Sequence, residues 1–417
     1  MSTEQKPIDL IAGWPNPGLL PPTRLETAAH DVLQDPYLAK QSLRYGPDEG
    51  YHPLIEEIAR WLTRFYCPKD AIGPERICIT GGASQNLGCA LQVFTDPVYT
   101  RNVWMVAPTY FRACPIIDDN GFGGRIKGVP EGEEGIDIDY LSTHIAKSEE
   151  DAVRNGNTEP KMKTHYSWRK IYKHVIYAVP TFANPSGCLM SLARREQLWS
   201  SKISGPARNR FQARYPRLVD IDRYLDGGPV SEWGNTMSNG SFSKIIAPGC
   251  RTGWAEATPK LAWGLSQCGS SRSGGAPSQL VASMVHQMLT SGSFEEHLRG
   301  TLLPSYEKRY RRLMQSIQAR LVPLGVTLPK LHEDTAGGYF IWLTLPSGLN
   351  AEDIRTAALE EENLTIMAGW QCQVQGDDES GLDLSRNLRL SFAWEDFDAL
   401  DDGVQRLAKV IGSKVTR

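Results

Sequence analysis

The chain has 417 residues, of which 41% are hydrophobic and 22% charged, so it can bury a full core and is long enough for two or three domain-sized units. Its 45 lysines and arginines nearly balance 48 aspartates and glutamates, and the formal net charge of −3 argues against nucleic acid and membrane surfaces as partners. No apolar stretch is long enough to span a bilayer and residues 1–10 lack a signal-peptide pattern, which predicts a cytoplasmic protein.

The first part of the chain is predicted to form turns and two helices. Residues 11–22 (IAGWPNPGLLPP) carry too many glycines and prolines for one regular element, whereas residues 25–34 show the helical spacing of apolar side chains. A turn-rich segment at residues 44–53 leads into an amphipathic stretch, in which apolar residues recur every three or four positions between Leu54 and Phe65. We expect this second helix to cover a sheet.

In the middle of the chain, short apolar runs alternate with helix signals. The runs are residues 76–80 (RICIT), 102–108 (NVWMVAP) and 174–180 (HVIYAVP), and residues 81–94 have a helix-like pattern. This alternation is typical of a parallel sheet with crossover helices, so the sequence predicts an α/β fold. Before the third run, residues 147–174 are too polar for a core and are predicted to form a surface insertion.

The last part of the chain predicts a smaller α+β domain. A helical stretch at residues 302–321 is followed by two strand-like runs, residues 337–345 (GGYFIWLTL) and 388–394 (LRLSFAW). We therefore predict three parts, which are an N-terminal segment joining the small domain (1–45), a large domain (46–300) and a small C-terminal domain (301–417).

The segment with the clearest chemistry is SNGSFSKIIAPGCRTGWAEA, residues 238–257. Its lysine, Lys244, is flanked by Ser241 and Ser243 and is followed by Arg251 across a Pro-Gly turn. Two hydroxyls and an arginine form a site for a dianion, because the guanidinium binds phosphate oxygens through two hydrogen bonds and the hydroxyls donate further ones. A lysine beside a phosphate site is suited to form a Schiff base with a phosphorylated aldehyde.

The motif SFSKIIAPGCRTGW resembles the cofactor-lysine motif of class I/II aminotransferases, the pyridoxal-phosphate enzymes of fold type I. Further motifs of that family follow in its order between Gly13 and Trp394. The resemblance implies an α/β fold with a mostly parallel sheet in the large domain, pyridoxal 5′-phosphate as cofactor and Lys244 as the catalytic residue that carries it. It also implies the exchange of an amino group between an amino acid and a 2-oxo acid.

A second motif, TGGASQ at residues 80–85, closes a strand and opens a helix, so that backbone N–H groups and the helix dipole face an anion. By resemblance this turn is the family's phosphate cup. The residues implied to hold the cofactor there are Ala83, Ser84, Gln85, Ser241, Ser243 and Arg251.

Two motifs at strand ends are implied to hold the cofactor ring. Tyr110 follows the 102–108 run, where an aromatic side chain can lie flat against a planar ring. Asn184 stands in the Asn-Pro-Ser-Gly turn after the 174–180 run, and its side-chain amide can donate a hydrogen bond to a phenolate oxygen. Each motif is common by itself, so its weight comes from its place in the family's order.

Two further positions concern the substrate and a partner subunit. In NLRLSFAW, strand alternation puts Arg389 on the face opposite Leu388 and Leu390, and by resemblance this arginine grips the α-carboxylate of the substrate. Arg386 takes its place if the register differs. Tyr45, at the start of YGPDEGYHPL, is similar to the tyrosine that reaches the phosphate of the neighbouring subunit, which implies a homodimer.

The chain departs from the family after the Asn-Pro-Ser-Gly turn. Relatives continue with a helix and an apolar strand ending in an aspartate, which pairs with the ring nitrogen, and then a tyrosine. Here a helix signal at residues 191–199 runs into polar residues 200–217, and the apolar run that is left contains Asp220 and Asp222, with Tyr224 beyond it. Either these residues fold back into the vacant place, or a helix-strand unit is absent. The second interpretation predicts weak cofactor binding and slow transamination.

Other functions stay open. The same residues serve carbon–sulfur lyases and cyclopropane-forming synthases of this fold, because fold and cofactor do not decide the fate of the carbanion. A transcription regulator fused to a DNA-binding domain is disfavoured, since the motifs begin at Gly13. Several motifs are similar to those of fungal proteins related to 2-aminoadipate and aromatic aminotransferases, some of which serve secondary metabolism. The cysteines lack CxxC spacing and the histidines lack paired-ligand spacing, so no metal site is expected.

Overall fold

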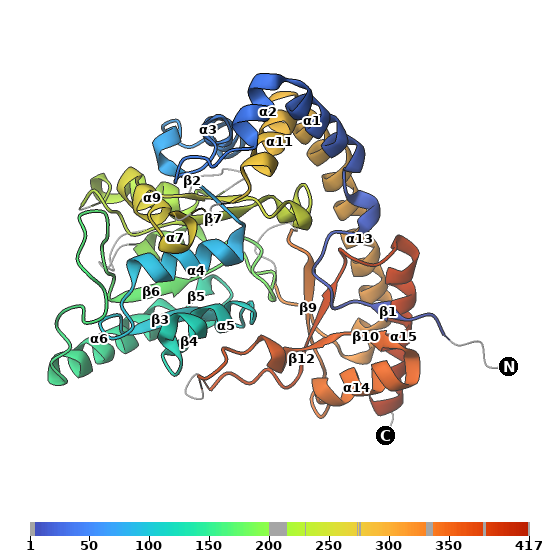
Figure 1. Ribbon diagram of the computed structural model, residues 1–417. Helices are drawn as coiled ribbons and strands as arrows, with labels where there is room; N and C mark the ends of the chain where they lie inside the picture. Colours follow the sequence, from blue (N-terminus) through green and yellow to red (C-terminus); the bar gives the residue numbers. More distant parts are fainter. Residues whose placement is uncertain are drawn as a thin grey trace.

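The computed structural model describes residues 5–199, 215–229, 231–272, 274, 277–330, 337–377 and 381–415. Two lobes, each with sheets inside and helices outside, lie next to each other (Figure 1). Helix α13 (Leu303–Arg320) belongs to both, because Tyr306 packs against the core of the larger lobe and Leu313 is buried in the core of the smaller one. The space between the lobes is where residues distant in sequence can meet.

The larger lobe contains two sheets with the strand orders β2-β8-β7 and β5-β4-β3-β6. Strand β3 runs parallel to β4 and β6, which confirms the predicted α/β fold, whereas β8 is antiparallel to β2 and β7. The strands are β2 (Ile77–Thr80), β3 (Asn102–Ala107), β4 (Ile126–Gly132), β5 (Gly135–Ile136), β6 (His174–Tyr177), β7 (Ser238–Ser241) and β8 (Gly253–Glu256).

Helices cover these sheets. The amphipathic helix predicted after Tyr51 is α3, and its Leu54 and Ile58 pack against Ile77 and Ile79 of β2, which is why its apolar stripe has helical spacing. The helices of this lobe are α1 (Pro22–Gln34), α2 (Pro36–Ser42), α3 (His52–Tyr66), α4 (Ala83–Phe94), α5 (Ala113–Ile117), α6 (Ile138–Arg154), α7 (Leu192–Trp199), α8 (Leu218–Tyr224), α9 (Pro259–Ser266), α10 (Gly269–Arg272), α11 (Gln279–Thr290) and α12 (Ser293–His297).

The polar segment at residues 147–174 is not only a surface insertion. Its first residues complete α6, in which Ala152 is buried. Near its other end, Trp168 and Tyr172 pack against the cluster that contains Phe94, so two aromatic side chains fix a stretch of polar chain to the lobe. The sequence interpretation was wrong for these two ends, because single aromatic residues in a polar run carry no periodic signal.

Two of the edge strands of these sheets are β6 and β7. Among the described residues, no strand pairs with the second edge of β6 or of β7, and Ile176 of β6 is 36% exposed. The run at residues 218–222 does not fill this place, because it forms helix α8. The carboxylate of Asp220 accepts the backbone N–H of Arg217 at 3.0 Å and so caps that helix. The interpretation in which this run folds back as a strand is therefore wrong, and most of residues 200–217 lie outside the described residues.

The smaller lobe holds the C-terminal part of the chain and its first residues. β1 (Ile8–Asp9) pairs with β10, and Ile8 and Leu10 join a core otherwise built from C-terminal residues. Helix α1 instead packs against α11 of the larger lobe, so the domain limits at residues 45 and 300 stay a prediction. The other elements of this lobe are β9 (Phe340–Thr344), α14 (Ala351–Glu362), β10 (Leu364–Thr365), β11 (Met367–Ala368), β12 (Asn387–Ser391) and α15 (Phe397–Val415).

No helix in the described part of the chain combines the length and the apolar character that a membrane-spanning segment needs. The predicted C-terminal helix at residues 302–321 corresponds to α13, and the two predicted strands correspond to β9 and β12. Strand β12 is central in its sheet, with β11 and β9 on either side. Its residues from Leu388 to Ser391 are buried on both faces.

Candidate active site

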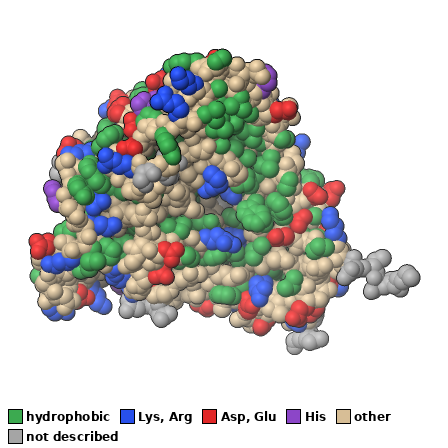
Figure 2. Space-filling view, viewed as in Figure 1, with side chains coloured by type: hydrophobic (Ala, Val, Ile, Leu, Met, Phe, Trp, Pro, Cys, Tyr) green, Lys and Arg blue, Asp and Glu red, His purple; other side chains and the backbone are tan. Residues whose placement is uncertain are grey.

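Most of the residues singled out in the sequence lie between the two lobes. The contacts that join the lobes there include those from Lys244 to the ring of Tyr339 and from Arg389 to Asn184. Figure 2 shows a hollow near the middle of the molecule, with lysine and arginine side chains around it. An electropositive hollow of this kind attracts anionic ligands.

The predicted phosphate cup forms where β2 ends and α4 begins. Gly82 has a positive φ of 100°, and a Cβ atom built there would lie 3.1 Å from Nη2 of Arg251 and 3.3 Å from Oγ of Ser241. Arg251 donates to Oγ of Ser243 at 3.2 Å, and the two serine hydroxyls are 3.0 Å apart. Only glycine fits this turn, and the arginine and both serines gather beside it.

The first residues of α4 complete the cup through their backbone. The N–H groups of Ala83 and Ser84 stand in the first turn, where a helix offers no internal acceptors, so they are available to an anion. Gln85 differs, because its side-chain oxygen accepts the N–H of Gly81 at 2.9 Å and its amide donates to Ser271 at 3.3 Å. Only the backbone of Gln85 is therefore available to a ligand in this arrangement.

Lys244 ends a short 3-10 turn that follows β7. Its Nζ donates to the backbone oxygen of Gly13 at 2.5 Å and lies 5.6 Å from the ring centre of Tyr339. The hydroxyl of Tyr339 donates in turn to the backbone oxygen of Lys244 at 3.1 Å. Desolvation by these neighbours lowers the pKa of the Lys244 ammonium group below its ordinary value, so more of it is a neutral, nucleophilic amine.

Tyr110 and Asn184 line one small cavity. Its walls come from the end of β3 and from the chain after β6, and the Ala107–Pro108 and Asn184–Pro185 peptide bonds at the two ends are cis. Tyr177 forms another part of the wall, and burial raises the pKa of its phenol. The structure thus brings together the two residues that the sequence assigned to the cofactor ring. Among the described residues, no acidic side chain belongs to this lining.

Arg389 is buried beside this cavity, with only 4% of its surface exposed. Its Nη1 donates to Oδ1 of Asn184 at 2.9 Å, its Nη2 donates to the backbone oxygen of Ile11 at 2.8 Å, and the guanidinium lies 3.8 Å above the ring of Phe340. Its Nε is buried without an acceptor. Desolvation lowers the pKa of this guanidinium to about 10. A buried cation with a donor left over is suited to bind a carboxylate.

The other candidates for the substrate and partner roles lie elsewhere. Arg386 is exposed and donates to the backbone oxygen of Leu345 at 3.3 Å, so the observed register favours Arg389 for the carboxylate. Tyr45 is 91% exposed, next to Gly274 at the surface of the larger lobe. Its position leaves the side chain available to another subunit.

Asp220, Asp222 and Tyr224 do not reach the candidate site. Asp220 pairs with Arg217 at 2.8 Å, and Arg217 pairs at 2.6 Å with Glu256. Glu256 lies opposite Ile77, at the start of β2, whereas the cup forms at its end. Asp222 accepts the N–H of Asn235, and the hydroxyl of Tyr224 accepts the N–H of Asp70. These residues lie near the end of the sheet away from the phosphate cup, so their suggested role at the cofactor ring is wrong.

Sequence reasoning missed the contacts that Gly13 and Tyr339 make with Lys244, and the contact of Ile11 with Arg389. Gly13 and Ile11 act through backbone oxygens, which no side-chain motif reports. Tyr339 bonds to both Lys244 and Tyr306 and stands directly after two glycines, which is a weak signal by itself. An N-terminal segment, which the sequence analysis predicted only to be irregular, therefore contacts both Lys244 and Arg389.

The residues present fit pyridoxal phosphate at three points. The glycine-lined turn with Ser241, Ser243 and Arg251 suits its phosphate, and the partly desolvated amine of Lys244 suits its aldehyde. The cavity beside Asn184 suits its phenolic oxygen. For a protonated ring nitrogen, the described part of this lining offers no carboxylate.

Comparison with known proteins places this geometry among aminotransferases. The chain is 32% identical to an uncharacterized protein of Saccharomyces cerevisiae, over 98% of this chain and 97% of that protein. It is 30% identical to the 2-aminoadipate transaminase of Thermus thermophilus, over 97% and 90% of the two chains. No family model matches the chain.

The fold also resembles a solved structure. This is the α-aminoadipate aminotransferase of Thermus thermophilus complexed with N-(5′-phosphopyridoxyl)-L-leucine. The two structures agree with a TM-score of 0.73 and 27% sequence identity, over 98% of this chain and 93% of the other. The similarity thus extends over both lobes and is not limited to the motifs.

Proposed function

This chain belongs to the class I/II aminotransferases, the pyridoxal-phosphate enzymes of fold type I, and from this premise we propose that it exchanges an amino group between an amino acid and a 2-oxo acid. The observation that carries the proposal is the contact of buried Arg389 with Asn184, next to Tyr110 and across the lobe boundary from the Lys244 turn. This contact joins a carboxylate-binding group to the residues suited to a planar ring.

Each residue has a distinct role in this proposal. Pyridoxal phosphate, when bound, supplies an aldehyde for the substrate amine and a ring that withdraws electrons from the substrate carbon. Arg251 and the N-terminus of α4 bind the phosphate, and Arg389 orients the substrate through its carboxylate. Lys244 moves a proton at its Nζ, which its lowered pKa favours.

The test is a screen of amino donors against 2-oxo acids with purified, cofactor-loaded protein. A new amino acid and a new 2-oxo acid, formed in equal amounts, support the proposal. Release of ammonia or a thiol without a new amino acid points instead to the lyase chemistry that the same residues can serve. The panel includes 2-aminoadipate, because a relative carries that name, and aromatic amino acids. A role in fungal secondary metabolism stays a prediction.

We expect Arg389→Ala to raise the KM for every amino donor by a similar factor. The guanidinium is buried, so loss of its pairing with the α-carboxylate should cost about 2–5 kcal/mol whatever the donor's side chain. Initial rates over a range of concentrations with three donors measure this effect. Arg386→Ala is the matched control, because that arginine is exposed. An effect of Arg386→Ala in place of Arg389→Ala would show that the carboxylate binds elsewhere.

We also propose a homodimer in which the two subunits share their sites. Its support is Tyr45, since such an exposed tyrosine, with Tyr37 and Leu43 also exposed nearby in sequence, suits an interface between subunits. Mixing Tyr45→Phe chains with Lys244→Ala chains should restore activity, because one site of each mixed dimer keeps both residues. Activity is measured across mixing ratios after joint refolding. No gain over the parent variants at any ratio would count against shared sites.

A further inference from the structure

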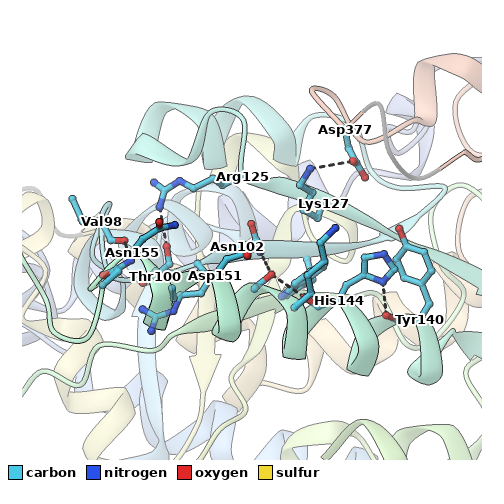
Figure 3. Close-up of a pocket in the computed structure, with 16 residues that line it drawn as sticks. Val98, Thr100, Asn102, Arg125, Lys127, Tyr140, His144, Asp151, Asn155 and Asp377 are labelled. Carbon is cyan, nitrogen blue, oxygen red and sulfur yellow. Dashed lines mark hydrogen bonds and ion pairs between the residues drawn. The ribbon is translucent and has the colours of Figure 1, made fainter.

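A second pocket lies at the end of the larger lobe's four-stranded sheet that faces away from Lys244. It has a volume of about 400 Å³, within the range of small-molecule sites. Asn102, at the start of β3, lines it, whereas Tyr110 follows the end of the same strand. Figure 3 shows Arg125 and Lys127 on the side of the strands, with His144 and Tyr140 on helix α6 facing them. The reaction proposed above uses none of these residues.

Arg125 is a fixed cation in this pocket. Its Nη1 donates to the backbone oxygen of Thr100 at 2.8 Å, its Nη2 donates to that of Gly121 at 2.6 Å, and it lies 4.9 Å from the ring centre of Phe122. Within the described residues it forms no ion pair, and desolvation lowers its pKa. Asp96 attracts it only from a greater distance, and this carboxylate already accepts four backbone N–H groups. The positive charge of Arg125 is thus held in place without a direct ion pair in the part of the chain that the structure describes.

Lys147 adds a second positive charge. It lines the pocket from α6, is exposed, and forms no ion pair or hydrogen bond in the part of the chain that the structure describes. The remaining charges are largely balanced within the protein. The pairs are Arg101 with Glu149 at 2.9 Å, Lys127 with Asp377 at 3.6 Å and Asp151 with Arg154 at 3.0 Å. After this pairing, the pocket keeps the positive charges of Arg125 and Lys147.

The pocket also offers hydrogen-bonding groups beside these charges. Asn157 donates its side-chain amide to the backbone oxygen of Val98 at 2.7 Å, and its Oδ1 is buried without a donor. Asn155 belongs to the same lining and is exposed. An acceptor that lacks a donor is unfavourable when buried. Rotation of the Asn157 amide toward the pocket would let a ligand hydroxyl group supply that hydrogen bond.

We propose that this pocket is a binding site for a small anion that also carries hydroxyl groups, with the anionic group at Arg125 and Lys147 and a hydroxyl donating to Asn157. A hydroxylated phosphate ester and a hydroxy acid share this chemistry. The volume admits molecules of that size. The site stands independently of the aminotransferase function, because it rests on residues at the other end of β3.

The test is calorimetric titration of the full chain at constant ionic strength, with glycerol 2-phosphate and L-malate as probes and glycerol as the uncharged control. Saturable binding of one or both anions, and none of glycerol, is the expected result. The stronger probe shows whether the ligand is a phosphate ester or a carboxylate. Lys147→Gln should weaken that binding by about fivefold, the effect of losing one partly solvated charge contact.

Two kinds of variant locate the binding. Lys308→Gln, which removes an exposed lysine of α13 in the smaller lobe, should leave the affinity unchanged. Arg125→Gln should weaken binding further than Lys147→Gln, and melting temperatures report whether loss of its two carbonyl contacts disturbs the fold. Binding that is unchanged in Lys147→Gln but lost in Arg251→Gln or Arg389→Ala would place the anion in the candidate active site and overturn the proposal. No saturable binding of either anion would overturn it as well.

Discussion

Replacing Lys244 by alanine is expected to lower transamination by about 10⁴-fold or more, because one amine serves both as the anchor of the cofactor and as the group that moves the proton. Wild-type protein with added pyridoxal phosphate should show an absorption band near the visible edge that borohydride removes. The variant should lack this band. Spectra before and after reduction measure the anchoring, and initial rates measure the catalytic loss.

A matched control separates this effect from the general loss of a partly buried lysine. Desolvation also lowers the pKa of Lys163, which donates to the backbone oxygen of Gln92 at 2.8 Å and lies outside the candidate site. Lys163→Ala should keep the reducible band and the activity. A reducible band that persists in Lys244→Ala would refute the assignment of that lysine.

The parts of the site that the sequence could predict are local. The phosphate cup depends on a strand, two glycines and the first turn of a helix, and all of these are contiguous in residues 77–94. The turn after β7 likewise brings Ser241 and Ser243 near Arg251 through a short segment. The local sequence of such motifs largely determines their geometry, since neighbouring residues in a tight turn have few possible arrangements.

The parts that the sequence could not predict depend on contacts between distant segments. Lys244 meets the backbone oxygen of Gly13, and Arg389 meets that of Ile11, although more than two hundred residues separate the members of each pair. The antiparallel position of β8 was also missed, because apolar runs do not reveal strand direction. These features are decided by how the two lobes pack.

Helix α8 shows a second reason why prediction from the sequence failed. The alternation in residues 218–222 fits a strand with one polar face, yet Val219, Asp220, Ile221 and Asp222 are all buried in a helix. Asp220 is compensated by Arg217, which also binds Glu256, and Asp222 accepts the N–H of Asn235, so both aspartates are buried without a polar face. Periodicity alone could not separate these alternatives.

This arrangement decides what the acidic residues of α8 can do. A carboxylate that keeps the ring nitrogen of the cofactor protonated must lie near Tyr110 and Asn184, the residues assigned to the ring. Asp220 instead lies with Glu256 beside the start of β2. The described lining of the cavity next to Tyr110 contains no acid. The alignment with the yeast relative spans 448 positions, more than the 417 residues of this chain, so that relative has residues for which this chain has no counterpart.

We therefore expect this chain to transaminate slowly, at a rate roughly 10²–10⁴-fold below that of its Thermus thermophilus relative on a shared substrate. This factor is the usual contribution of a positioned acid–base group. Asp222→Asn should not lower this rate further, because Asp222 contacts Asn235 and not the site. Asp220→Asn should act on stability, costing about 1.5–3 kcal/mol of the free energy of unfolding, since it weakens the charged hydrogen bonds to Arg217. Rates per folded molecule and denaturant midpoints distinguish the two effects. A chain as active as its relative, and inactivated by either substitution while still folded, would show that an aspartate of α8 serves the ring after all.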